Sequence, residues 1–153
     1  RNFIEGIFKL MRIIGLDLGT KTLGVAISDQ TETIASGVTT IRFSENDFES
    51  CLKELEKIIA LYEVKLIVIG LPKNMNNTYG EATLRTKEFS RKLENKFNIE
   101  VVMQDERLSS VAANNVLLLA DLSRRKRKSK VDTVAATIIL QSYLDIRKGQ
   151  KHG

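Results

Sequence analysis

The hydrophobic and polar positions at the start of the chain follow the pattern of three consecutive strands. RIIGLDLG (12–19), LGVAISD (23–29) and TIASGVTTIRF (33–43) are rich in β-branched residues and are separated by short polar turns. Because such short connections usually join neighbouring antiparallel strands, the pattern predicts an antiparallel meander. Asp17 lies inside the first apolar stretch, and burial of an ionised carboxylate costs free energy unless a partner compensates it.

The pattern then changes to helices alternating with strands. Ser44 is predicted to cap a helix, because apolar residues recur after it at helical spacing: Leu52, Leu55, Ile58, Ile59 and Tyr62. The continuous apolar run VKLIVIGLP (64–72) predicts a parallel strand that is buried on both faces and ends at Pro72.

The second half of the chain continues this alternation. A charged helix is predicted over 81–97, a fifth strand over IEVVMQDE (99–106), and a helix capped by Ser109 or Ser110. VDTVAATIILQSYLD (131–145) is apolar on most of its circumference and is predicted to be a buried helix. The fold class is therefore α/β: a five-stranded mixed sheet, three antiparallel strands and then two parallel ones, flanked by helices.

Composition limits the class of protein. The chain has 153 residues, of which 42% are hydrophobic, and no apolar run of the length that a membrane-spanning helix needs. We expect a single soluble domain over 11–148. The ten residues before Met11 are interpreted as an extension without a part in the fold.

Cysteine and histidine are almost absent. Cys51 is the only cysteine and His152 the only histidine, so we expect neither an internal disulfide nor a His/Cys zinc site. Cys51 lies on the helix after Ser44 and is interpreted as a small structural side chain. Any bound metal would have oxygen ligands.

Positive charge is concentrated in one segment. The net charge is +5, and RRKRKSK (124–130) alone carries six positive charges, without which the chain would be slightly acidic. Such a cluster is either a solvated loop or a phosphate-binding segment, and the composition does not distinguish the two.

Polar residues collect where the predicted parallel strands end. Because ligand sites of α/β sheets lie beyond the carboxyl ends of these strands, we expect several of these side chains to face one crevice: Asp17, Pro72 and Asn74, Asp105 and Glu106, and Asp132.

Four blocks of the sequence resemble one family. GLDLGTKTLGVAISD, GLPKNMNNTYG, DERLSS and RKRKSKVDTVAATIILQSYL resemble, in order and spacing, the signature of the YqgF (RuvX) family between Met11 and about Asp145. The resemblance implies an RNase H-like fold and a bacterial cytoplasmic nuclease for the 5′ end of pre-16S rRNA, in older usage a Holliday junction resolvase. It also implies that the catalytic acids are Asp17, Glu106 and Asp132.

The match departs from the family pattern at two positions. Asn77 stands where the family usually has glycine, and asparagine also tolerates a left-handed backbone. Ala112 stands where a glutamate often follows the third block, so no function is assigned to that position.

The residue types agree with this implication. Carboxylates suit Mg²⁺ or Mn²⁺, and two such ions can stabilise both the attacking and the leaving oxygen of a phosphodiester displacement. In this interpretation Asp17 bridges the ions, and Glu106 and Asp132 complete the metal site. Candidate phosphate-binding residues are Lys21, Asn74, Arg107, Arg124, Arg125, Lys126, Arg127, Lys128 and Lys130.

Each candidate acid also has a structural interpretation. Asp17 could accept hydrogen bonds from the amides of the Gly19–Lys21 turn. Asp132 could be a capping-box acid, three residues after Ser129. Asp105 and Glu106 could form surface ion pairs, Asp29 is interpreted as a turn residue, and Asn74 could only shape its loop.

Other functional classes remain as alternatives. The DxGTxxxG turn also resembles the phosphate-binding hairpin of the actin, sugar-kinase and chaperone ATPases, but those enzymes need two lobes. A second alternative is a non-catalytic RNA-binding protein, although aromatics make up only 6% of the chain and no stacking platform is visible. Expected partners are pre-rRNA or branched DNA and the small-subunit precursor, with a monomer favoured over a dimer because the most apolar helix, about 131–144, would be buried.

Overall fold

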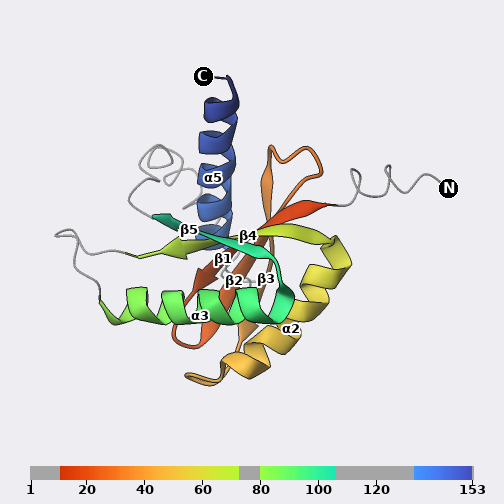
Figure 1. Ribbon diagram of the computed structural model, residues 1–153. Helices are drawn as coiled ribbons and strands as arrows, with labels where there is room; N and C mark the ends of the chain where they lie inside the picture. The colour runs from red at the N-terminus through yellow and green to blue at the C-terminus, as the bar shows by residue number, and fades with distance from the viewer. Residues whose placement is uncertain (1–10, 73–79, 106–132, 153) are drawn as a thin grey trace.

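A computed structural model describes residues 11–72, 80–105 and 133–152 of the chain, with side chains up to residue 149. One five-stranded sheet forms the middle layer (Figure 1). Helix α5 lies on one side of it, and helices α2 and α3 lie on the other. The elements are β1 (Arg12–Leu18), β2 (Thr22–Ser28), β3 (Ala35–Arg42), α2 (Phe48–Tyr62), β4 (Val64–Leu71), α3 (Glu81–Phe97), β5 (Glu100–Asp105) and α5 (Val134–His152).

The strand order is β3-β2-β1-β4-β5. Strands β1, β2 and β3 pair antiparallel, whereas β1 pairs parallel with β4, and β4 with β5. This confirms the predicted mixed sheet. Strand β4, which lies between β1 and β5, is buried at six consecutive positions from Leu66, as its continuous apolar run predicted.

Helices α2 and α3 cover one face of the sheet, called here the α2/α3 face, with the larger hydrophobic core. Phe48 begins α2 and stacks edge-on against Phe89 of α3, with the ring centroids 5.2 Å apart. Both rings pack against the strand side chains that point to this side, among them Ile14, Leu16 and Ile69. Cys51 is fully buried in the same core, which confirms that it is a structural side chain.

The predicted start of α2 is wrong by three residues. The helix is capped by Asp47, whose carboxylate accepts a hydrogen bond from the amide of Ser50 at 3.3 Å. Ser44 instead closes a turn, because its carbonyl accepts a hydrogen bond from the amide of Asp47. Asn46 between them has a φ of 67°, and a left-handed residue there prevents the helix from starting at Ser44.

Helix α5 covers the opposite face, called here the α5 face, and approaches the strands closely through small residues. A Cβ atom on Gly15 would lie 2.5 Å from the Cβ of Leu140, and one on Gly37 would collide with the side chain of Thr133. The side chains of α5 buried here are Ala136, Ile139, Leu140 and Leu144. The described part of α5 begins after Thr133 and continues past the predicted end at Asp145.

The far end of α5 is tied to the β2–β3 hairpin. Glu32 of the hairpin accepts from Lys65 of β4 and from Arg147 of α5, each at 2.7 Å. Gln141 adds hydrogen bonds to the backbone of Thr33 and Ala35. These contacts join three segments that are distant in the sequence.

Other predictions concern segments that the structure leaves undescribed. The helix expected after Ser109 or Ser110 lies outside the described residues, and so do the first ten residues of the chain. Among the described helices, none is both long and apolar enough to cross a membrane.

Candidate active site at the carboxyl edge of the sheet

The carboxyl ends of the three parallel strands meet at one edge of the sheet. Strands β1, β4 and β5 are neighbours and run in the same direction, so Asp17, Pro72 and Asp105 lie at this edge. These three residues, which were predicted to face one crevice, thus reach the same edge of the sheet. α/β sheets commonly place their sites at such an edge.

Asp17 occupies the last but one position of β1 and is partly buried, whereas the four residues before it are fully enclosed. It pairs in register with Gly24 of β2. On the other side Leu16 pairs with Ile69, so Gly70 of β4 is the neighbour of Asp17 on that strand. The carboxylate thus projects between two positions without side chains, which leaves room around it for a ligand.

Register defines a row of residues across the whole sheet, called here the aspartate row. Residues in register share a face, and this row lies on the α5 face, since Gly15, two residues before Asp17, packs against α5. In strand order the row is Thr40, Gly24, Asp17, Gly70 and Gln104. Gln104 is 7% exposed, and its side-chain nitrogen has no hydrogen-bond partner within the described part of the chain.

Asp105 lies on the other face. It follows Gln104 directly in β5, and successive residues of a strand point to opposite sides. The sheet therefore brings Asp17 and Asp105 to one edge but not to one face. Asp105 is thus poorly placed to share a ligand with Asp17.

The turn between β1 and β2 is closed by its own backbone. The amide of Gly19 donates to the carbonyl of Thr22 at 2.7 Å, so it is engaged away from the Asp17 carboxylate. The Gly19 amide, one of the three that could have bound Asp17, is therefore used within the turn. Lys21, a predicted phosphate-binding residue, is exposed in this turn, and its carbonyl accepts a hydrogen bond from the amide of Phe43.

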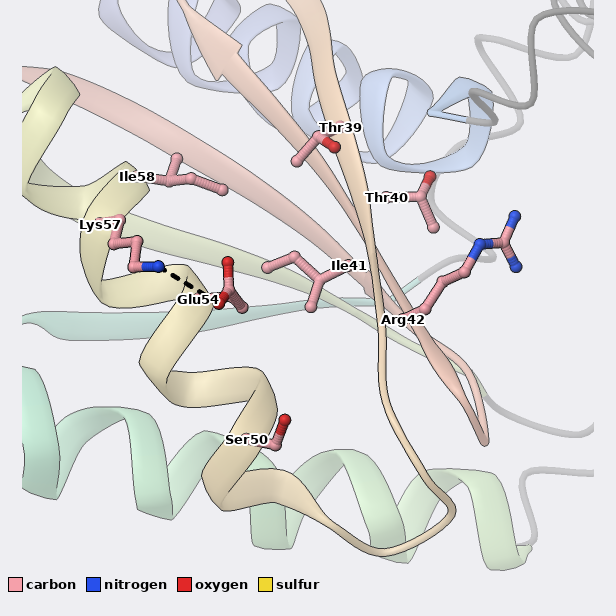
Figure 2. Close-up of a pocket in the computed structure, with 8 residues that line it drawn as sticks. All are labelled: Thr39, Thr40, Ile41, Arg42, Ser50, Glu54, Lys57 and Ile58. Atoms are coloured by element: carbon pink, nitrogen blue, oxygen red, sulfur yellow. Dashed lines mark hydrogen bonds and ion pairs between the residues drawn. The ribbon is translucent and has the colours of Figure 1, made fainter.

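Two residues on β3 belong to this region and were not identified from the sequence. Thr40 is part of the aspartate row, and Arg42 follows two positions later, in register with Thr22. Figure 2 shows both side chains pointing away from α2, while Thr39 and Ile41 lie on the helix side. The alternation of Ile41, Arg42 and Phe43 is the signal that could have identified Arg42.

The remaining predicted site residues lie outside the described residues. Within the described residues 11–72, 80–105 and 133–149, no three Asp, Glu, His or Cys side chains lie close enough together to hold a metal. Two of the three predicted ligands are outside these ranges. The undescribed candidates are Glu106, Asp132, Asn74, Arg107, Arg124, Arg125, Lys126, Arg127, Lys128 and Lys130.

A cavity of about 520 Å³ lies between α2 and β3, on the α2/α3 face (Figure 2). Its polar lining includes Glu54 and Lys57, which form an ion pair with each other at 3.3 Å. The lining also includes Thr40 and Arg42 of the edge strand β3, whereas Asp17 lies two strands away and is not among the lining residues.

Two groups with shifted pKa values lie away from the carboxyl edge. The pKa of Asp29 is lowered to about 2 by hydrogen bonds from the Thr31 hydroxyl and from the amides of Thr33 and Ile34. This confirms Asp29 as a turn residue. Burial raises the pKa of Cys51 to about 12, which makes its thiol a poor nucleophile.

The overall arrangement of strands and helices is that of the RNase H-like class. Over 91% of this chain and 96% of the other, it superimposes on the Thermus thermophilus protein described as "T. thermophilus RuvC in complex with Holliday junction substrate", with a TM-score of 0.61 and 12% identity. At that identity the likeness shows the fold, and it confirms the fold class expected from the sequence.

Sequence comparison defines the family. The model of the family described as "RuvX: Holliday junction resolvase" matches residues 11–146, and the chain belongs to this family. A relative from Geobacillus sp. is 51% identical over 90% of this chain and 100% of its own length. One from Bacillus subtilis is 48% identical over 88% of this chain and 98% of its own. Both are named "Putative pre-16S rRNA nuclease".

Proposed function

We propose that this protein is a metal-dependent nuclease that processes the 5′ end of pre-16S rRNA in the cytoplasm. The observation that carries the proposal is the position of Asp17. It is a partly buried carboxylate at the carboxyl edge of the parallel strands, with glycines on both neighbouring strands. The names of the relatives, at about half identity over nearly the whole chain, support pre-16S rRNA as the substrate.

In this proposal Asp17, Glu106 and Asp132 hold Mg²⁺ or Mn²⁺. The donor set fits such ions, because all three side chains offer only oxygen. Strand alternation favours Glu106 over Asp105 as the partner of Asp17, since every second residue of a strand returns to the same face. When bound, the ions supply positive charge that stabilises the attacking and leaving oxygens of phosphodiester cleavage.

The protein's own cations hold the substrate. Lys21 is exposed beside the aspartate row and is assigned to a phosphate that flanks the cleaved bond. Arg107 and the segment 124–130 are assigned to further phosphates, and Asn74 to a contact beyond β4. Charges of this kind position the strand and give no base specificity.

A second candidate is a structure-specific endonuclease that cuts Holliday junctions. The description of the matching family favours it, and so does the fold shared with RuvC. A two-fold symmetric junction needs two symmetrically presented sites and therefore a dimer, whereas cleavage of one RNA strand needs a single site. We favour a monomer that acts on RNA.

The decisive experiment compares the two substrates directly. The purified protein is incubated with Mg²⁺ or Mn²⁺ and either a pre-16S rRNA 5′ fragment or a four-way DNA junction. We expect cleavage of the RNA. A stable dimer that cuts the junction at paired, symmetric positions would instead support the resolvase.

Asp17→Asn tests the site itself. The change removes the charge and keeps the shape, so we expect it to abolish metal-dependent cleavage in a folded protein. Asp47→Asn is the matched control, because it makes the same chemical change at the cap of α2, and asparagine caps helices as well as aspartate does. Full activity in Asp17→Asn would contradict the proposed site.

The basic segment provides an independent test. Replacing Arg124, Arg125, Lys126, Arg127 and Lys128 with serine should weaken RNA binding and flatten its salt dependence by roughly 0.7 to 0.9 unit per lost phosphate contact. The same affinity and slope in both proteins would show that the segment is only solvated. If RNA binds but no metal-dependent cleavage occurs, the protein is a non-catalytic RNA-binding protein.

A further inference from the structure

We infer that Arg42 binds a backbone phosphate of the nucleic acid and so extends the substrate path from Asp17 to the edge strand β3. The inference rests on the proposed nuclease function, and it concerns a residue outside the segments assigned above. Three observations carry it: the face on which Arg42 lies, its exposure, and its lack of an ion pair with any described carboxylate.

The face follows from register. Thr40 pairs in register with Gly24, and Gly24 pairs with Asp17, so Thr40 and Asp17 lie on the same face of the sheet. Arg42 lies two positions after Thr40 and therefore shares that side. Figure 2 agrees, because the Thr40 and Arg42 side chains both point away from α2.

The distance suits a bridging strand of nucleic acid. Two strand spacings of about 4.8 Å and two residues of about 3.4 Å place the Cα atom of Arg42 roughly 12 Å from that of Asp17. On the intervening strand, Gly24 beside Asp17 has no side chain, and Thr22 beside Arg42 has only a small polar one. A backbone crossing the sheet from Asp17 toward β3 would meet Arg42 within a few nucleotides.

The chemistry of Arg42 also fits a phosphate. Its side chain is exposed, and it forms no ion pair with the carboxylates of the described segments. A guanidinium binds phosphate oxygens through two parallel hydrogen bonds, which gives both strength and orientation. The hydrogen bond between Phe43 and Lys21 holds the end of β3 against the turn that carries Lys21, so two cations border the same edge.

Arg42→Gln tests the inference, and Arg91→Gln is its matched control. Arg91 is exposed on α3, across the sheet from the site, so the two variants lose the same charge on opposite sides. Binding of a short fluorescein-labelled single-stranded RNA and of a labelled four-way DNA junction is measured by anisotropy at several salt concentrations. Both variants are made in the Asp17→Asn protein so that binding is read without cleavage.

We expect Arg42→Gln to weaken binding of the preferred probe roughly five- to tenfold and to lower the salt slope by somewhat less than one unit. Arg91→Gln should change neither value appreciably. Arg42→Lys should recover part of the affinity, because it restores the charge without the bidentate geometry. In the background with Asp17 intact, Arg42→Gln should raise KM and leave kcat nearly unchanged.

Failure of this inference differs from failure of the proposed function. Suppose that the native protein cleaves, and that Arg42→Gln has the same affinity, salt slope and cleavage rate as Arg91→Gln. Arg42 is then only a solvated cation. If the native protein cleaves neither substrate, the nuclease proposal fails. A loss of binding specific to Arg42→Gln would then still show that Arg42 contacts nucleic acid.

Discussion

The two faces of the central sheet differ in what they do with their side chains. On the α2/α3 face, large apolar residues fill the layer, including two phenylalanines in edge-on contact. On the α5 face the helix rests on glycines, Gly15 and Gly37, and the row beyond it carries Asp17 between two more glycines. The α2/α3 face holds the larger apolar core, whereas the α5 face combines a smaller apolar cluster with close backbone contacts at glycines.

This difference separates stability from chemistry within one sheet. Burial of large side chains supplies most of the free energy of folding, and the α2/α3 face concentrates it. Because that face stabilises the strands, the α5 face can leave a carboxylate partly exposed at the strand ends. Substitutions on the two faces should therefore fail in different ways, and the following predictions are ordered from the largest expected effect to the smallest.

Phe89→Ala should be the most destabilising change. The ring is completely buried and packs against Phe48, so its removal leaves a cavity and should cost about 3–5 kcal/mol in the free energy of unfolding. Urea denaturation followed by circular dichroism measures this. A loss below about 1 kcal/mol would contradict the claim that this face carries the stability.

Gly15→Ala tests the opposite condition, in which an added atom has no space. The new Cβ would lie 2.5 Å from the Cβ of Leu140 and 3.1 Å from the carbonyl oxygen of Ala136, so α5 must shift. We expect a loss of about 1–3 kcal/mol in the same unfolding measurement. Gly149→Ala is the control, because nothing lies within 4 Å of its added Cβ and alanine favours the helix.

Asp29→Asn should have a smaller, pH-dependent effect. The aspartate accepts hydrogen bonds from Thr31, Thr33 and Ile34 that lower its pKa from 3.8 to about 2. Since its folded pKa is depressed, its contribution is present above pH 3.8 and is lost as the pH falls through about 2. At neutral pH we expect the free energy of unfolding to fall by about 1 kcal/mol or less, because solvent screens this exposed turn. Below pH 3.8, the free energy of unfolding of the variant should depend less on pH than that of the native protein.

Asp17→Asn should change the stability of the metal-free protein least. Asparagine keeps the shape of the side chain and an oxygen that accepts hydrogen bonds, so the unfolding transition should move little. Millimolar Mg²⁺ or Mn²⁺ should raise the melting temperature of the native protein and raise it less in Asp17→Asn. An identical shift in both, measured by calorimetry, would contradict a metal site at Asp17.

The sequence predicted the sheet well because its strands differ strongly in pattern. The continuous apolar run of β4 identified the parallel centre, and the short turns around β2 identified the antiparallel side. The start of α2 was missed because Ser44 and Asp47 are equally good caps. The left-handed backbone of Asn46, which decides between them, is not visible in the pattern.

Part of the candidate site was missed for a different reason. The β2–β3 pairing shifts between Val25 and Ala26, so Gly37 and Thr39, two residues apart, lie opposite adjacent residues of β2. Simple alternation therefore gives the wrong face for part of β3. Only the register shows that Gly37 packs against α5 and that Thr40 belongs to the aspartate row.

The ion pairs of Glu32 should affect how α5 and the β2–β3 hairpin open locally in the native protein. Glu32 binds Arg147 near the far end of α5, and Gln141 fastens the same half of the helix to the hairpin. In hydrogen exchange, amides around residues 141–147 should therefore exchange together with the β2–β3 hairpin as one cooperative unit. The other end of α5, from Thr133 to Leu140, is buried against Gly15 and Gly37, so its amides should be at least as well protected from exchange.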